Sequence, residues 1–156
     1  MRRWLAWDPQ IAPRQFVGYT LARLGVAFVW IWHGLVPKLI FDHPDESVML
    51  TDVGIAPERA AQLVRAAGVG EVLFGLVVLA AWRWRVPLWI TAAVMVFATI
   101  GVTVGSPRFL TAAFNPVTLN FQLFLLAVIA LILGRPPSPA RVCFQKSPPA
   151  EAASRE

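Results

Sequence analysis

The chain has 156 residues, of which 57% are hydrophobic and 15% charged, whereas soluble domains contain about 45–50% apolar and about 25% charged residues. This is the composition of a membrane protein, and its long apolar segments leave no length for a separate ATPase or kinase module. The formal charge of +5 does not indicate nucleic-acid binding, because the Lys and Arg residues lie at the ends of apolar segments instead of along one polar face.

The N-terminal segment, residues 1–15, carries Arg2, Arg3 and Arg14 ahead of an apolar run over residues 16–39. This run is too long for the apolar region of a signal peptide, and it lacks a small-x-small cleavage site. Because a helix needs about 20 mostly apolar residues to cross the hydrocarbon core of a bilayer, residues 16–39 are predicted to form the first span.

The polar stretch that follows, residues 40–65, contains a helix start. The sequence Asp-His-Pro-Asp-Glu at 42–46 is typical of a helix N-terminus, and an apolar group at 48–50 precedes Gly54. We expect a short helix here that lies on the outer membrane surface.

Three further apolar runs complete the membrane part. Pro87 and Pro116 suit the first turn of a helix, and glycines follow the third and fourth runs. The second run can begin earlier, near Pro57, with a polar extension. The predicted spans cover residues 66–82, 87–104 and 116–133. The predicted fold class is therefore all-α, an integral membrane four-helix bundle over residues 16–134 with a short outer interfacial helix.

The distribution of basic residues predicts the orientation of the bundle. Lys and Arg concentrate in residues 1–15, 83–85 and 135–156, which are expected to be cytoplasmic, so that both termini lie inside. The loop at 40–65 holds more acidic than basic residues and is expected to face outward. Tryptophans suited to the cytoplasmic interface are Trp4, Trp7, Trp82, Trp84 and Trp89.

The C-terminal segment, residues 135–156, is rich in Pro, Ser, Ala and charge, and is predicted to be a disordered tail. It contains the only cysteine of the chain, Cys143. No intrachain disulfide, CxxC pair or thiolate zinc site can therefore form.

Few ionisable residues lie within the spans, and each costs roughly 2.5–3.5 kcal/mol at the bilayer centre. Arg23 lies about two turns into the first span, where its side chain is expected to snorkel to the headgroups in a structural role. His33 and Lys38 lie near the outer end of the same span. Glu71 lies within the second span, where a carboxyl must be neutral, paired or hydrated. It is the best single candidate for a functional residue.

The fourth span opens with several polar residues. A spacing of three and four places Asn115, Thr118 and Gln122 on one helical face, with Asn120 displaced from it. Asn115 is well suited to cap the helix before Pro116. Thr118 and Asn120 can serve either interhelical hydrogen bonds or a ligand.

The predicted topology brings polar residues of three helices to one depth. The first span is predicted to end outside, while the second and fourth begin outside. The polar residues at these span ends therefore all fall in the outer half of the bundle. Such convergence predicts a ligand-binding site between helices, in which a Glu71–His33 pair would donate and accept a proton. A structural network would give the same pattern. The predicted site residues are His33, Lys38, Glu71, Asn115, Thr118 and Asn120, with Arg23, Trp30 and Glu46 as further candidates.

Small residues recur at helical spacing in the first three spans. They let helix backbones approach closely, a structural use of such residues. The positions concerned are Gly18, Ala22, Gly25, Gly68, Gly75, Gly101 and Gly105.

The chain resembles DoxX-like membrane proteins over roughly residues 23–134. The residues that carry this resemblance are Arg23, the string Trp32-His33-Gly34-Leu35-Val36-Pro37-Lys38, Glu46, the string Gly70-Glu71-Val72-Leu73-Phe74-Gly75 and the string Asn115-Pro116-Val117-Thr118-Leu119-Asn120. The resemblance implies a four-span bundle in the bacterial cytoplasmic (inner) membrane. Relatives are associated with quinone-linked sulfur oxidation and membrane redox defence. This sequence has no cysteine pair and only His33 and His43, so it offers no haem or metal ligand set, and no oxidoreductase activity or cofactor is predicted.

Two functions fit these observations. The first is binding of a lipophilic small molecule, a quinone or isoprenoid, in the outer half of the bundle. The second is a non-enzymatic accessory or assembly subunit that docks a membrane protein partner through the outer helix or the tail. A homo-oligomer stays open, and transport is the least favoured function because four spans make a thin wall and no inverted repeat is visible.

Overall fold

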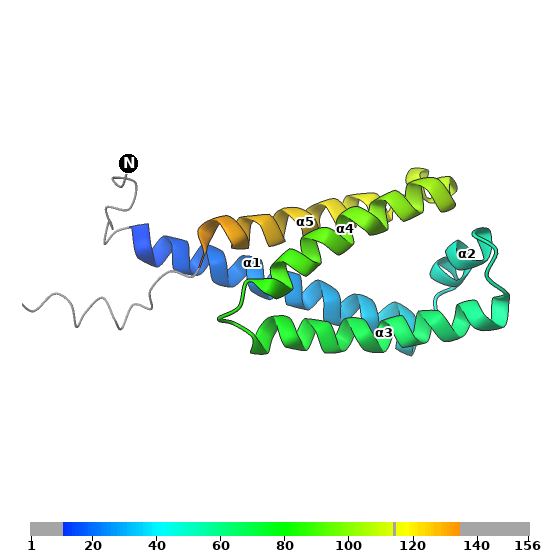
Figure 1. The fold of residues 1–156 in the computed structure, drawn as a ribbon, viewed down its shortest axis with the longest axis horizontal. Helices are drawn as coiled ribbons and strands as arrows, with labels where there is room; N and C mark the ends of the chain where they lie inside the picture. The colour runs from blue at the N-terminus through cyan, green and yellow to red at the C-terminus, as the bar shows by residue number, and fades with distance from the viewer. Residues whose placement is uncertain (1–10, 114, 135–156) are drawn as a thin grey trace, which may run out of the picture.

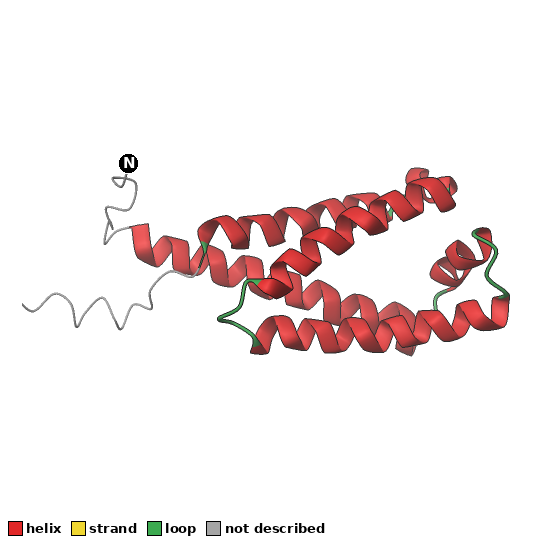
Figure 2. Ribbon diagram, viewed as in Figure 1, coloured by secondary structure: helices red, strands yellow, loops and turns green. Residues whose placement is uncertain are grey.

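The computed structural model describes residues 11–113 and 115–134, and within these ranges the chain is helical with no strand (Figures 1 and 2). Four of the described helices are long and apolar enough to cross a membrane. The prediction of an all-α membrane bundle is therefore confirmed. The elements are α1 (Ile11–His33), η1 (Gly34–Ile40), α2 (Pro44–Asp52), α3 (Pro57–Ala80), α4 (Val86–Gly105), η2 (Pro107–Thr111) and α5 (Pro116–Leu133).

The helix boundaries differ from the predicted spans mainly at the first two. Helix α1 already begins at Ile11, before the predicted start at Phe16, and continues through η1 to Ile40. Helix α3 includes the polar extension and begins at Pro57. Proline lies in the first turn of α3, α4 and α5, where its missing N–H group would have had no partner within the helix. The predicted tail, residues 135–156, lies outside the described residues.

The helices form two packed pairs, α1 with α3 and α4 with α5, and contact between α1 and α5 joins the pairs. Helix α1 packs against α3 and α5, and α4 packs against α5. Figure 1 shows that the beginning of α1 and the end of α5 lie at the same end of the bundle, with α2 at the opposite end. We refer to these as the terminal end and the α2 end.

The bundle has a small-residue core and an apolar exterior. Val26, Ala27 and Leu88 are among the buried residues at its centre, together with Ala127 and Ala130. Many large apolar side chains point outward, and Val104 and Ile132 remain more than three quarters exposed. Such a surface is unusual for a soluble monomer but suits contact with acyl chains.

Close contact between α3 and the first helix depends on three glycines. A Cβ atom at Gly34 would lie 2.5 Å from the carbonyl oxygen of Gly68, and one at Gly75 would lie 3.0 Å from the carbonyl oxygen of Ala27. Only glycine fits where two backbones are this close. The expectation that Gly101 also lets two helix backbones approach closely is wrong, because nothing lies within 4 Å of its Cβ position.

Candidate functional site

At the α2 end, the first helix widens into a π-helical segment, η1. It contains Pro37, which has no backbone N–H, and its last turns are closed by Phe41 N–H to Val36 O at 3.0 Å and His43 N–H to Pro37 O at 2.7 Å. π-Helical turns are rare and often occur at functional sites. Within this segment Lys38 is buried against α3, close to Gly68.

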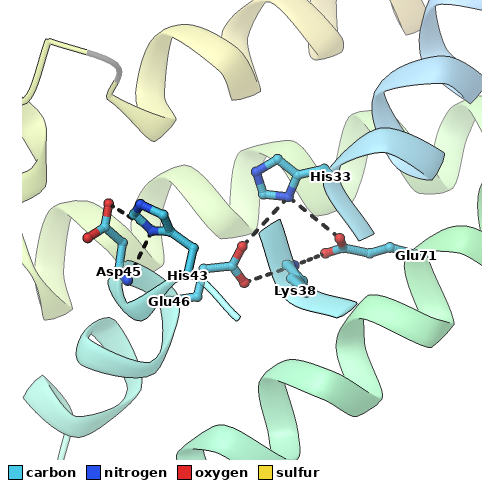
Figure 3. A network of polar contacts seen from close by, with 6 residues as sticks. All are labelled: His33, Lys38, His43, Asp45, Glu46 and Glu71. Carbon is cyan, nitrogen blue, oxygen red and sulfur yellow. Dashed lines mark hydrogen bonds and ion pairs between the residues drawn. The ribbon is translucent and has the colours of Figure 1, made fainter. Parts of the chain in front are cut away.

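Four ionisable side chains from four elements meet at the α2 end: His33 of α1, Lys38 of η1, Glu46 of α2 and Glu71 of α3 (Figure 3). We call them the α2-end cluster. Lys38 Nζ lies 2.8 Å from Glu46 Oε2 and also pairs with Glu71 Oε1. His33 Nδ1 lies 3.5 Å from Glu71 Oε2 and 3.7 Å from Glu46 Oε1. Each carboxylate thus faces both the ammonium group and the imidazole.

The side chains of the cluster differ in how deeply they are buried, and their charges do not cancel. The side chain of Lys38 is 5% exposed, whereas that of His33 is 39% exposed. With a neutral imidazole, two carboxylates and one ammonium group leave a net charge of −1. Glu71 Oε2 is buried and has no hydrogen-bond partner among the described residues. A buried charged oxygen without a donor is costly, and native structures rarely leave one in that state.

Helix α2 is attached to the bundle at both of its ends. Its first turn carries Glu46, which pairs with Lys38, and its last residue is Asp52. Asp52 accepts hydrogen bonds from Ser106 Oγ at 2.8 Å and from Arg108 at 2.7 Å. The helix therefore bridges the two pairs of the bundle, from α1 and α3 to the end of α4. The prediction of a short helix in this loop is confirmed.

Arg23 does not snorkel to the headgroups, and this expectation is wrong. Its side chain is fully buried and donates to the carbonyl oxygens of Val78, Ala81 and Trp84 and to the hydroxyl of Tyr19. The acceptors lie at and just beyond the end of α3, where carbonyl groups lack partners within the helix. A cation at a helix C-terminus is also favoured by the helix dipole. Arg23 lies toward the terminal end, apart from the α2-end cluster.

The remaining predicted residues make contacts of other kinds. Asn115 caps α5, because its Oδ1 accepts from Thr118 N at 2.8 Å. The hydroxyl of Thr118 donates to Asn115 O at 2.9 Å, and Thr118 is exposed. Asn120 is buried, and its side chain has no hydrogen bond to any described residue. Trp30 Nε1 donates to Thr91 Oγ1 of α4 at 3.1 Å. No described ion pair or hydrogen bond joins these residues to the α2-end cluster.

Sequence reasoning underrated two acidic residues of α2. Glu46 was only a further candidate, yet it pairs with Lys38, and Asp52 was not singled out at all. A usable signal existed for Glu46, because an acid in the first turn of an outer helix lies near the outer ends of the spans. Asp52 offered no comparable signal, since its partners follow it by more than fifty positions.

A metal centre finds no support in the part of the chain that the structure describes. No group of three or more His, Cys, Asp or Glu side chains there is placed to hold a metal ion. The α2-end cluster offers hydrogen-bond donors and acceptors to a polar group.

The sequence profile of the DoxX-like family matches residues 27–129, more than half of the chain. The chain belongs to the DoxX-like family. No curated protein matches it, and no solved structure does. The α2-end cluster lies entirely within the part of this DoxX-like chain that the family profile covers, whereas Arg23 lies before it.

Proposed function

We propose that this DoxX-like protein binds a lipid-soluble molecule, a quinone or other isoprenoid, whose polar head group contacts the α2-end cluster. The observation that supports this proposal most is the buried Glu71 Oε2 atom without a hydrogen-bond partner, beside an imidazole that is partly exposed. Ionisable residues in membrane spans generally mark functional sites, and here a ligand head group would satisfy the missing interaction.

The four residues of the cluster have different roles in this proposal. Lys38 is nearly fully buried and paired on both sides, so it holds the two carboxylates in place. Glu71 and His33 face the ligand, and they offer it hydrogen-bond acceptors and a donor. Asn120, buried without a described partner, is proposed as a further contact from α5.

Binding can be measured by native mass spectrometry of the purified protein with the isoprenoid alcohol farnesol. We expect one bound molecule per chain, and about tenfold weaker binding for Glu71→Gln and His33→Ala. Glu58→Gln is the matched control, because Glu58 is an exposed acid in the first turn of the same helix. Equal binding by wild type and both site variants would contradict the proposal.

The alternative function, an accessory or assembly subunit, makes a different prediction. If the cluster only holds the bundle together, Glu71→Gln and His33→Ala should fail to accumulate in the membrane, and farnesol binding should be absent from the wild type. Crosslinking in mild detergent should then recover a stoichiometric membrane partner. Accumulation of both variants at the wild-type level, with weakened binding, favours the ligand site.

We further propose that the protein resides in the bacterial inner membrane with both termini in the cytoplasm. Nine Lys and Arg residues lie in the sequence segments 1–15, 83–85 and 135–156, whereas the segments 40–65 and 105–115 hold three. This asymmetry supports a cytoplasmic terminal end.

The single cysteine allows a direct test of this orientation. A membrane-impermeant maleimide should label Cys143 only after the cells are opened. In a Cys143→Ser background, Asp42→Cys should be labelled in intact cells. The opposite pattern would invert the topology.

A further inference from the structure

We propose that the α2-end cluster selects a head group that donates a hydrogen bond, such as an alcohol or phenol hydroxyl. It discriminates against acceptor-only groups, such as a quinone carbonyl or an ether, and against phosphate. This inference rests on the proposed function and narrows its ligands for the same site: among quinone-type molecules it selects the reduced quinol, and among other isoprenoids an alcohol.

The cluster contains more acceptors than donors. Glu46 and Glu71 present four carboxylate oxygens. The ammonium group of Lys38 contacts one oxygen of each carboxylate. The other two oxygens both face His33 Nδ1, at 3.5 and 3.7 Å. One ring nitrogen carries at most one proton, and both distances are longer than an ordinary N–H···O hydrogen bond, so this donor does not satisfy the two oxygens.

The unsatisfied acceptor is also the most enclosed one. Glu71 Oε2 is buried, whereas Glu46 lies on α2 with a more exposed side chain. A hydroxyl group can donate to Glu71 Oε2 and accept from the imidazole at the same time. A carbonyl or ether oxygen can only accept, and it would leave the carboxylate oxygen unpaired. Sites built around such a hydrogen bond reject analogues that lack the donor.

The charge of the cluster disfavours an anionic head group. The two carboxylates outnumber the one ammonium group, and a phosphate would add further negative charge beside them. Two arginines at the α2 end are already paired: Arg65 with Asp42 at 2.9 Å and Arg108 with Asp52 at 2.7 Å. Neither is available to balance a phosphate without losing its partner.

The inference is tested with three ligands that share one tail: farnesol, farnesyl methyl ether and farnesyl monophosphate. Binding is measured by native mass spectrometry at equal mole fraction in the detergent. We expect farnesol to bind at least about tenfold more tightly than either analogue, equivalent to about 1.4 kcal/mol. Decylubiquinol against decylubiquinone provides a second matched pair, in which only the quinol has hydroxyl donors.

Glu71→Gln tests whether Glu71 sets the preference. The carboxamide has nearly the same size but supplies N–H donors in place of one acceptor oxygen. We expect the preference for farnesol over its methyl ether to fall to about twofold or less. Glu58→Gln should keep the wild-type preference. Thermal unfolding in detergent shows whether each variant is folded.

The outcomes separate this inference from the proposed function. If the ether or the phosphate binds wild type as tightly as farnesol, and binding still depends on Glu71, the donor preference is wrong while the ligand site stands. If no ligand of either set binds wild type, or if all bind every variant equally, the proposed function is wrong and the inference with it.

Discussion

The first helix and its π-helical extension carry two buried cations that face α3, and their surroundings differ. Arg23 lies toward the terminal end, where every described partner is neutral: three backbone carbonyl groups and the hydroxyl of Tyr19. Lys38 lies at the α2 end between two carboxylates, with an imidazole beside them. Both side chains are almost completely excluded from solvent.

The difference lies in how far the partners of each cation satisfy one another. Arg23 gives donors to carbonyl groups at and just after the end of α3, and each of these carbonyl groups has at least one donor. At the α2 end, two carboxylates exceed what one ammonium group can satisfy, and Glu71 Oε2 remains without a partner. A buried ionisable residue therefore does not by itself indicate a ligand site. An excess of hydrogen-bond acceptors over donors around it is the better indication.

The largest expected effect is the loss of stability in Arg23→Ala. We expect the free energy of unfolding to fall by about 1–3 kcal/mol for each buried carbonyl group left without a donor. Arg23→Lys should be intermediate, because an ammonium group cannot reproduce the planar fork of the guanidinium. Thermal unfolding in detergent measures both. Wild-type stability of Arg23→Ala together with lost farnesol binding would reverse the roles assigned to the two cations.

The next effect concerns the backbone contact beneath the α2-end cluster. Gly34→Ala places a methyl group against Gly68 O, and we expect a loss of about 1–3 kcal/mol from overpacking, with weaker farnesol binding. Gly70→Ala is the control, because nothing lies within 4 Å of its Cβ position in the same region. Its stability should be unchanged or rise by up to about 1 kcal/mol. Equal behaviour of the two variants would show that the close contact is unimportant.

A smaller effect is expected for the attachment of α2. Glu46→Gln removes one of the two carboxylates that hold Lys38, and we expect a stability loss of about 1 kcal/mol or less. Amide hydrogen exchange should become faster at residues 47–51 and stay unchanged in α3. Asp45→Asn in the same turn is the control, since Asp45 pairs only with the exposed His43. Unchanged exchange in Glu46→Gln would mean that Asp52 alone fixes α2.

The smallest effect is expected for Arg65→Ala. The ion pair of Arg65 with Asp42 joins two side chains that are 65% and 52% exposed. After solvent screening we expect a loss of at most about 0.5 kcal/mol, which should vanish at high salt. Thermal unfolding at low and high ionic strength measures it. A larger loss of unfolding free energy that does not change with salt would show that this ion pair behaves like a buried one.

The fold could be predicted from the sequence because the bilayer imposes simple requirements. Apolar length identified all four spans, and prolines marked where α4 and α5 begin. The early start of α1 at Ile11 was missed, since the residues around Arg14 are too polar to count as membrane-embedded. Helix periodicity also suggested a contact at Gly101, but spacing alone does not tell which face meets a neighbour.

The candidate site was only partly predictable. Depth alone brought His33, Lys38 and Glu71 together, because Glu71 lies soon after the start of the apolar run at residue 66, and the other two lie near the end of the run at 16–39. The π-helical turn was not predictable, and it changes which face Lys38 occupies. Arg23 was placed at the headgroups because a sequence does not show that the end of α3 lies within reach. Asn115 and Thr118 serve the cap of α5, a local use that the sequence already favoured for Asn115.

The contact between Gly34 and Gly68 has a consequence for how the α2-end cluster can move. The two backbones meet within one turn of Lys38 and Glu71, so this half of the cluster is anchored to the rigid frame of the bundle. Glu46 sits on a nine-residue helix fixed by side chains at its two ends. If the proposed ligand enters beside the cluster, we therefore expect α2 to shift and the first helix and α3 to stay in place.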